Sequence, residues 1–287
     1  MKGIILAGGE GTRLNPITIP FSKQLVPIYD KPLIYYPLST LMELNIKDIL
    51  IITKSNQINN FKRLFLNGNQ LGLNISYAIQ DSPRGIAEAF LISEKFIKDC
   101  SVTLILGDNI FYGQNLYNEI SNKDFNKGGV IFLYEVQNPS QYGVANIANE
   151  RIINIIEKPK NPKSSLAVTG LYIYNKKIVD VAKSITLSKR NELEITDINN
   201  IYNKKFKLDF VKLKSTSVWF DAGTPNSLLQ SAQYIQAIQE RNNILVSSPE
   251  EVALRKKFIS KNEFKKLVNK MPDSLYRQSL KKLHIGN

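Results

Sequence analysis

Short apolar runs that alternate with segments of helical spacing constrain the fold of this chain more than any other feature. The apolar runs are rich in aliphatic and β-branched residues: Gly3–Ala7, Asp48–Thr53, Ile75–Ile79, Val102–Leu106 and Val130–Val136. Segments with apolar residues at helical period lie between most of them, such as Leu33–Leu44 and Ile86–Ile97. The alternation predicts an α/β fold, with a Rossmann-like mixed, mainly parallel central sheet flanked by helices.

The C-terminal part has a different pattern. Segments 144–156 and 206–214 look like shorter, alternating strands, which we expect to add antiparallel to the sheet. After Pro225 the pattern is helical almost to the end, with S-x-x-E helix starts at Ser248 and Ser260. We therefore expect one α/β domain over residues 1–240. A small helical annex over 241–287 would pack on that domain or at a subunit interface.

Composition narrows the chemistry. No apolar run is long enough to span a membrane, and the N-terminal run passes into glycines too early for a signal peptide. The single cysteine, Cys100, cannot form an internal disulfide, which fits a reducing cytoplasm. The single histidine, His284, argues against a histidine base and against Cys/His zinc sites. The chemistry is expected to rest on carboxylates, lysines, arginines and a hard metal ion.

The net charge of +13 is unevenly distributed. From Lys204 onward the chain has 16 lysines and arginines against 7 acidic residues. A basic region of this kind could bind nucleic acid. Its lysines, however, alternate with apolar residues at helical spacing, as in EEVALRKKFISKNEFKKLVNKM, which favours solvated helix faces. No zinc spacing or aromatic RNA-binding strand motif supports a nucleic-acid-binding protein, which stays the alternative from another class.

The glycine-rich stretch Leu6-Ala-Gly-Gly-Glu-Gly-Thr-Arg-Leu14 follows the first expected strand. Ligands in open α/β sheets bind at the carboxyl ends of strands, and glycines let backbone amides approach a phosphate. The stretch is not a Walker loop, because Gly9 stands where lysine is required. Nor is it a dinucleotide fingerprint, because Leu14 replaces the last glycine. Arg13 beside the loop amides favours a polyphosphate site over a ligand-free turn.

Two aspartates are candidates for binding a metal ion. Asp108 ends an apolar strand, and Asp221 precedes a glycine turn in Trp219-Phe-Asp-Ala-Gly-Thr224. Mg²⁺ prefers one or two carboxylates together with phosphate oxygens and water. Taken singly, each aspartate could equally cap a helix or close a turn, and sequence spacing does not show that the two meet.

The stretch GGEGTRLNPITIPFSKQLVPIYDKPLIYYPL resembles the N-terminal signature of sugar-phosphate nucleotidyltransferases, and within them the thymidylyltransferase branch. The resemblance continues in order over essentially the whole chain, through LGDNIFYG, YGVANI, EKPKNPKSSLAVTGLYIYN, ELEITDINNIY and WFDAGTPNSLL. It implies transfer of a thymidylyl group from dTTP to α-D-glucose 1-phosphate with Mg²⁺. It also implies a cytoplasmic homotetramer with no nucleic-acid or membrane partner, whose product leads to dTDP-rhamnose or related deoxysugars.

The resemblance also implies roles for residues of this chain. The catalytic residues would be Arg13, Lys23 and Lys158. The nucleotide would be bound by Gly8, Gly9, Gly11, Thr12, Arg13, Gln24, Gln80, Gly85 and Asp108. The sugar phosphate would be bound by Lys23, Asn109, Gly143, Glu157, Lys158, Val168, Thr169 and Arg190. The metal ligands would be Asp108 and Asp221.

Three positions depart from the family pattern. Arg84 and Glu88 stand where the family more often has an acid and a glutamine, and Asn146 replaces an acid. A sibling nucleotidyltransferase that uses UTP, or less readily ATP or CTP, therefore stays an alternative. A glycosyltransferase is disfavoured, because Asp108-Asn-Ile110 lacks the second aspartate of a D-x-D motif.

Overall fold

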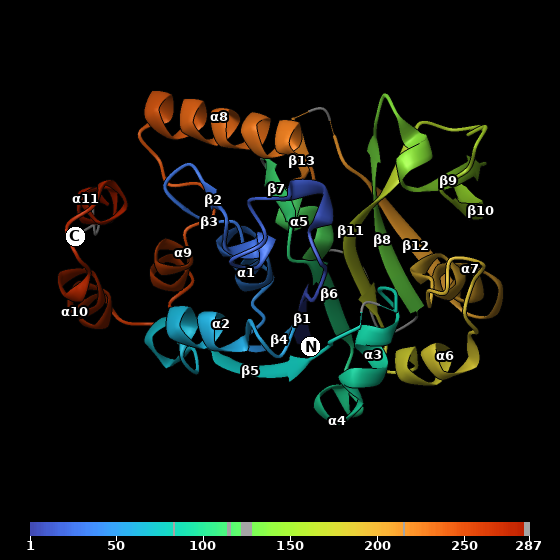
Figure 1. Ribbon diagram of the computed structural model, residues 1–287, viewed down its shortest axis with the longest axis horizontal. Helices are drawn as coiled ribbons and strands as arrows, with labels where there is room; N and C mark the ends of the chain where they lie inside the picture. Colours follow the sequence, from blue (N-terminus) through green and yellow to red (C-terminus); the bar gives the residue numbers. More distant parts are fainter. Residues whose placement is uncertain (83, 114–115, 122–127, 215, 284–287) are drawn as a thin grey trace.

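The computed structural model describes residues 1–82, 84–113, 116–121, 128–214 and 216–283. His284, the single histidine, lies outside this part of the chain. The centre of the molecule is a nine-stranded mixed sheet with helices on its faces, so the expected α/β fold is confirmed (Figure 1).

One half of the sheet is entirely parallel. Its order is β6 (Val102–Leu106), β1 (Lys2–Ala7), β4 (Asp48–Thr53) and β5 (Asn74–Ile79). β1, β4 and β6 are mainly apolar because helices cover both faces, and Ile4 and Ile5 of β1 are fully buried on opposite sides. The terminal strand β5 is partly exposed, at Asn74, Ser76 and Ile79. β1 and β6 run in register, so the glycine loop and Asp108 leave the sheet at the same edge.

The other half of the sheet is mixed. β11 (Leu166–Tyr174) lies antiparallel between β6 and β8 (Gly128–Glu135). β9 (Gly143–Ala148) and β10 (Arg151–Glu157) form an antiparallel hairpin, as expected for segment 144–156. The antiparallel prediction for segment 206–214 is wrong, because β12 (Lys207–Lys212) runs parallel to β8. Helix α7 (Ile195–Lys205) precedes β12, which pairs with β8 on the side away from β11. Alternation within a segment identifies a strand but does not specify the direction of its partner.

Two small ribbons stand beside the main sheet. β7 (Asn109–Gly113) pairs antiparallel with β13 (Ser217–Asp221), and β2 (Pro27–Ile28) pairs with β3 (Lys31–Pro32). Within the described ranges, the loops contain four 3₁₀ turns: η1 (Thr12–Leu14), η2 (Lys23–Leu25), η3 (Asn69–Leu71) and η4 (Pro139–Gln141).

The remaining helices flank the sheets or follow them in the chain. They are α1 (Tyr35–Glu43), α2 (Ile58–Phe65), α3 (Glu88–Ile92), α4 (Glu94–Ile97), α5 (Leu116–Ser121), α6 (Ile178–Ser184), α8 (Pro225–Asn242), α9 (Pro249–Arg255), α10 (Lys261–Lys270) and α11 (Leu275–Lys282). The single helix expected over 86–97 is broken at Ser93, whose hydroxyl donates to the Ala89 carbonyl at 2.6 Å. No helix in the described ranges is both long and apolar enough to cross a membrane.

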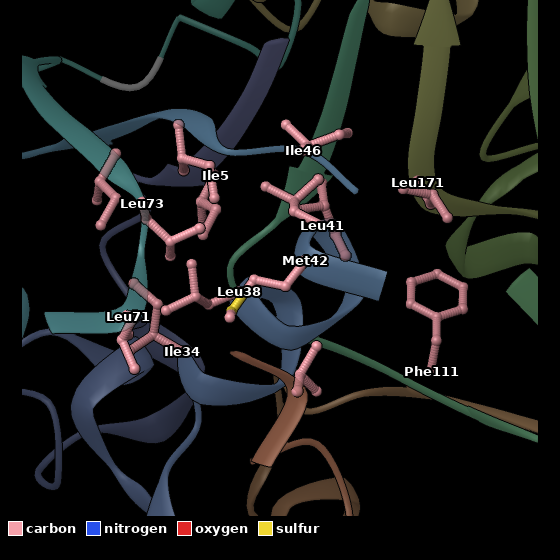
Figure 2. Packing of buried hydrophobic residues seen from close by; sticks show 14 of the residues in the cluster. Ile5, Ile34, Leu38, Leu41, Met42, Ile46, Leu71, Leu73, Phe111 and Leu171 are labelled. Atoms are coloured by element: carbon pink, nitrogen blue, oxygen red, sulfur yellow. The ribbon is translucent and has the colours of Figure 1, made fainter. Parts of the chain in front are cut away.

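Helix α1 fills the centre of the larger core. Figure 2 shows Leu38, Leu41 and Met42 of this helix beside Ile5 of β1 and Leu71. Burying each such side chain contributes about 1.5–3 kcal/mol to folding. Helix α9 contributes Val252 and Ala253 to the same cluster, so the first helix after α8 packs on the main domain. In Figure 1, α10 and α11 lie at the end of the molecule opposite the β9–β10 hairpin.

A buried cap attaches α9 to α11. The Ser248 hydroxyl accepts a hydrogen bond from the Glu251 amide at 3.3 Å and contacts the Tyr276 hydroxyl at 2.7 Å. We expect Ser248→Ala to lower the free energy of unfolding by about 1–2 kcal/mol, because it removes the cap and one buried hydrogen bond. Urea titration measures the loss. Ser260→Ala, which removes the exposed cap of α10, is the control, and a larger loss in the control would contradict the role given to Ser248.

Candidate active site

A cavity of about 620 Å³ opens at the carboxyl edge of the parallel strands, within the size range of small-ligand sites. Segments distant in the sequence line it, from η1, the β6–β7 junction, β9, β10, β11 and β13. The lining includes ten residues that the sequence marked: Thr12, Arg13, Asp108, Asn109, Gly143, Glu157, Lys158, Val168, Arg190 and Asp221.

The β7–β13 ribbon brings the two aspartates together. Its register places Asp221 opposite Asn109, and the Ala222 amide donates to the Asp108 carbonyl at 3.0 Å. The Asp108 carboxylate pairs with the Lys23 ammonium. Asp221 forms no ion pair with any residue in the described ranges.

The two carboxylates differ in their electrostatics. Burial opposes ionisation of Asp108, but the Lys23 ammonium and hydrogen bonds from Lys23 and Asn109 outweigh it and lower the pKa of Asp108. Burial and repulsion from Asp108 raise the pKa of Asp221 to about 6, despite attraction from Lys23, Arg13 and Lys158. The pair therefore holds surplus negative charge that a bound cation would relieve.

Asn109 fixes the position of Asp108. Its Nδ2 donates to Asp108 Oδ1 at 3.0 Å, while its Oδ1 accepts from the Gly170 amide at 3.0 Å and from Trp219 Nε1 at 2.6 Å. A Cβ atom on Gly170 would lie 2.5 Å from Asn109 Oδ1, so β11 needs glycine here. Asn109 thus connects three strands at the edge of the cavity.

The glycine loop and Arg13 lie beside the aspartates. Gly11 adopts a φ of 66°, and the Thr18 hydroxyl donates to its carbonyl at 2.8 Å. A Cβ on Gly223 would lie 2.6 Å from the Arg13 guanidinium and 2.9 Å from Asp221 Oδ1. A Cβ on Gly9 would lie 3.8 Å from Lys23 Nζ. Gly9 of the loop thus lies close to the Lys23 ammonium, and the Arg13 guanidinium lies close to Asp221.

The two glutamines predicted to bind the nucleotide, Gln24 and Gln80, are buried and do not line the cavity. Gln24 receives a hydrogen bond from the Ser22 hydroxyl, and Gln80 Nε2 donates to Glu88 Oε2 at 2.8 Å. A Cβ on Gly8 would lie 2.7 Å from Gln80 Oε1, so this oxygen faces the loop. Gly85, with a φ of 100°, packs against the backbone of Leu193, where a Cβ would meet the carbonyl at 2.3 Å.

The far side of the cavity carries Glu157 and Arg190. Glu157 Oε2 accepts from the Thr196 hydroxyl at 2.6 Å and lies beside Gly143. Arg190 pairs with Glu194 at 2.8 Å and reaches Glu157 at 3.5 Å. Hydrogen bonding to Glu194 raises the pKa of Arg190. Acceptors for hydroxyl groups and one strong cation therefore lie together here.

Two further predicted sugar-side residues of β10 and β11 are placed differently. The Lys158 amide donates to the Tyr142 carbonyl at 3.0 Å, which fixes the backbone just after β10, and Lys158 lines the cavity. Thr169 is fully buried and is absent from the lining that includes Val168 and Gly170, its neighbours in β11. Adjacent strand residues face opposite sides of a sheet, so the Thr169 side chain is turned away from the cavity.

Comparison with known proteins identifies the family of this chain. The model of the nucleotidyl transferase family matches residues 2–238. The chain belongs to this family. A glucose-1-phosphate thymidylyltransferase of Mycolicibacterium smegmatis is 47% identical to this nucleotidyl transferase over 92% of each chain. One from Neisseria meningitidis is 46% identical over 99% of each chain.

Solved structures of nucleotidyl transferases have a similar fold. A glucose-1-phosphate thymidylyltransferase from Bacillus anthracis superposes with a TM-score of 0.75 at 42% identity, covering 82% of this nucleotidyl transferase and 94% of that chain. A UDP-glucose pyrophosphorylase in complex with UDP-glucose has a TM-score of 0.71 at 25% identity, covering 82% and 98%.

The nucleotidyl transferase also has cavity residues to which sequence reasoning gave no role. Trp219 bonds Asn109, Tyr142 packs against Trp219 at a centroid distance of 5.3 Å, and Thr196 bonds Glu157. All three lie inside or next to quoted motifs, namely WFDAG, YGVANI and ELEITD. Their contacts join segments distant in sequence, so no local pattern identifies them.

The two aspartates fit a divalent cation that takes its other ligands from substrate. No group of three or more acidic, histidine or cysteine side chains that could hold a metal occurs among the described residues of this nucleotidyl transferase. Asp108 and Asp221 supply the one or two carboxylates that Mg²⁺ uses alongside phosphate oxygens. Repulsion from Asp108 contributes, after burial, to the raised pKa of Asp221, and a cation between the two carboxylates would remove that repulsion.

Proposed function

We propose that this nucleotidyl transferase transfers a thymidylyl group from dTTP to α-D-glucose 1-phosphate, forming dTDP-glucose and pyrophosphate. The observation that carries the proposal is the paired Asp108 and Asp221 with Arg13, Lys23 and Lys158 around them. Anionic substrates need both a cation site and cationic side chains. The names of the relatives, at 46% and 47% identity over nearly the whole chain, support the choice of substrates.

The proposed reaction is a single in-line displacement. A phosphate oxygen of glucose 1-phosphate forms a bond to the α-phosphorus of dTTP, while the bond from that phosphorus to the bridging oxygen breaks and pyrophosphate leaves. Lys23 and Lys158 hold the attacking phosphate near the α-phosphorus. Arg13 and the amides of the loop at Gly8, Gly9, Gly11 and Thr12 stabilise charge on the leaving pyrophosphate. Catalysis of this kind rests on positioning and charge neutralisation.

Asp108 and Asp221 would hold the metal ion, for which we propose Mg²⁺. When bound, the ion neutralises charge on the α-phosphate and fixes its orientation. Lys23 pairs with Asp108, which keeps its ammonium beside the place where substrate phosphate would lie. Asn109 holds the Asp108 carboxylate in position through its Nδ2 bond.

The sugar would occupy the end of the cavity near β9 and β10, and the nucleotide would extend toward the glycine loop. Gln24, Gln80 and Gly85, which do not line the cavity, would lie near the base on the side of the parallel strands. Glu157 accepts hydrogen bonds from sugar hydroxyls, and Gly143 leaves room for the ring. Val168 lines the same end, while Thr169 supports it from behind. Arg190 lies near the sugar phosphate.

Pyrophosphate release from the purified chain with glucose 1-phosphate and Mg²⁺ tests the proposal. We expect release with dTTP to exceed that with UTP, ATP, CTP or GTP, and to stop when a chelator removes the metal and resume when Mg²⁺ is restored. A preference for UTP would replace the donor but keep the chemistry. No release with any nucleotide would contradict the enzymatic proposal, and heparin retention would then test the basic helices.

We also propose that the chain works as a homotetramer in the cytoplasm, with its nucleotide-sugar product feeding the synthesis of dTDP-rhamnose or related deoxysugars. The helical annex over 241–287 is the part proposed to pack between subunits. Light scattering after size exclusion measures the assembly. A particle mass four times the 32.6 kDa of one chain is the expected result, and a monomer would contradict it.

A further inference from the structure

Glu88 connects Gln80, which lies beside the glycine loop, to an exposed arginine. Its side chain is buried at the start of α3. Glu88 Oε2 accepts from Gln80 Nε2 at 2.8 Å, and Oε1 accepts from Arg84 Nε at 2.8 Å. Each carboxylate oxygen therefore has one donor, and the Arg84 guanidinium keeps Glu88 paired with a positive charge.

This contact fixes which end of the Gln80 carboxamide is free. An ionised carboxylate can only accept hydrogen bonds, whereas a carboxamide has an accepting oxygen and a donating nitrogen. Gln80 must therefore turn Nε2 to Glu88. Its Oε1 then faces the glycine loop, where a Cβ on Gly8 would lie 2.7 Å away.

The neighbouring glutamine is not fixed in this way. The partner of Gln24 is the Ser22 hydroxyl, which can donate or accept. Gln24 can thus present either end of its carboxamide to a base. Of the two glutamines, only Gln80 is held with an acceptor toward the loop.

We propose that Glu88, held by Arg84, is a positioning residue that makes Gln80 select bases with an N–H at ring position 3. Thymine and uracil carry a hydrogen-bond donor there, and cytosine carries an acceptor. Gln80 Oε1 can accept a hydrogen bond from the N3–H of thymine or uracil. The unprotonated N3 of cytosine has no hydrogen to donate, and its lone pair would repel that of Oε1. Sites built to bond one polar group reject analogues that cannot form the bond. This inference rests on the proposed function, which assigns the base to the neighbourhood of Gln80.

Glu88→Gln tests the inference with almost no change of shape. Arg84 would attract the Oε1 of the new glutamine, which leaves its Nε2 facing Gln80. The Gln80 carboxamide then turns over and presents Nε2 to the base. We expect the ratio of kcat/KM for dTTP to that for dCTP to fall at least tenfold. The ratio for dTTP and dUTP should stay within about twofold, because both bases carry the same N–H.

Arg84→Glu added to Glu88→Gln is the rescue variant. A glutamate carboxylate oxygen lies as many bonds from its Cα as the arginine Nε that makes the contact. As an acceptor it would draw the Nε2 of the residue 88 amide, whose oxygen would again accept from Gln80. We expect this double variant to restore at least half of the logarithmic loss in the dTTP-to-dCTP ratio. A merely structural role for Glu88 predicts no such recovery.

Glu94→Gln is the matched control. Glu94 forms an exposed ion pair with Lys183 on α6, so the same chemical change occurs away from the cavity. It should leave every nucleotide ratio unchanged.

The outcomes separate this inference from the proposed function. An unchanged dTTP-to-dCTP ratio in Glu88→Gln, or no recovery in the double variant, overturns the inference while wild-type activity with dTTP stands. If none of the nucleotides supports pyrophosphate release by the wild-type protein, the proposed function itself is overturned, and the inference with it. Melting temperatures of all four proteins, measured without nucleotide, show whether a variant has lost its fold.

Discussion

Asp221→Asn is expected to slow turnover about 10²–10³-fold while leaving the metal-free protein at least as stable as wild type. Turnover falls because an amide is a poor ligand for a hard cation, so the charge on the α-phosphate is no longer neutralised. Stability holds because burial and repulsion from Asp108 already disfavour the ionised Asp221 carboxylate, as its raised pKa indicates. A neutral amide removes that repulsion. Pyrophosphate release and thermal unfolding in chelator measure the two effects.

Asp108→Asn should distinguish the role of Asp108 from that of Asp221. It removes the same kind of ligand, but it also leaves the Lys23 ammonium, with 13% of its side chain exposed, without its anionic partner. We expect a comparable loss of turnover together with a loss of about 3 kcal/mol in unfolding free energy. Asp273→Asn, at a carboxylate with 75% of its side chain exposed, is the control for both. Asp221→Asn with more than a tenth of wild-type turnover would contradict its role as a metal ligand.

The parallel half of the fold could be predicted from sequence because its inner strands β1 and β4, and β6 beside them, are buried on both faces. The runs Asp48–Thr53 and Val102–Leu106 coincide with β4 and β6 in both bounds. Covered strands are apolar throughout, and this signal is local. The direction of β12 was not predictable, because the alternation within Lys207–Lys212 identifies a strand but not its partner. Pairing direction depends on the route of the preceding chain.

In the site, too, local features could be predicted from the sequence, whereas contacts between distant segments could not. Arg13, Asp108 and Lys158 stand in motifs, and the cavity brings them together. That Asp108 meets Asp221 depends on the register of β7 with β13, which pairs segments about a hundred residues apart. No local pattern contains that register. The contact between Gln80 and Glu88 shows the same limit, because the sequence marked Glu88 only as a departure from the family.

Asn109→Ala is expected to lower both stability and turnover, since three hydrogen bonds end on one side chain. The change leaves the Gly170 amide, the Trp219 indole N–H and Asp108 Oδ1 without their partner. A buried polar group left unsatisfied costs about 1–3 kcal/mol, so we expect a loss of at least 3 kcal/mol in unfolding free energy. Turnover should fall about tenfold or more, because Asp108 is no longer held toward Asp221.

Trp219→Phe shows which of these effects come from the indole N–H bond and which come from the other bonds of Asn109. It removes the indole N–H donor but keeps an aromatic ring against Tyr142, and it leaves the bonds from Asn109 to Asp108 and Gly170 intact. Its loss of stability should therefore be less than half that of Asn109→Ala, with turnover reduced by no more than a few-fold. Equal losses of turnover in the two variants would mean that the indole, rather than the Asn109 amide, holds Asp108 in position. Calorimetry and pyrophosphate release on the same preparations decide between them.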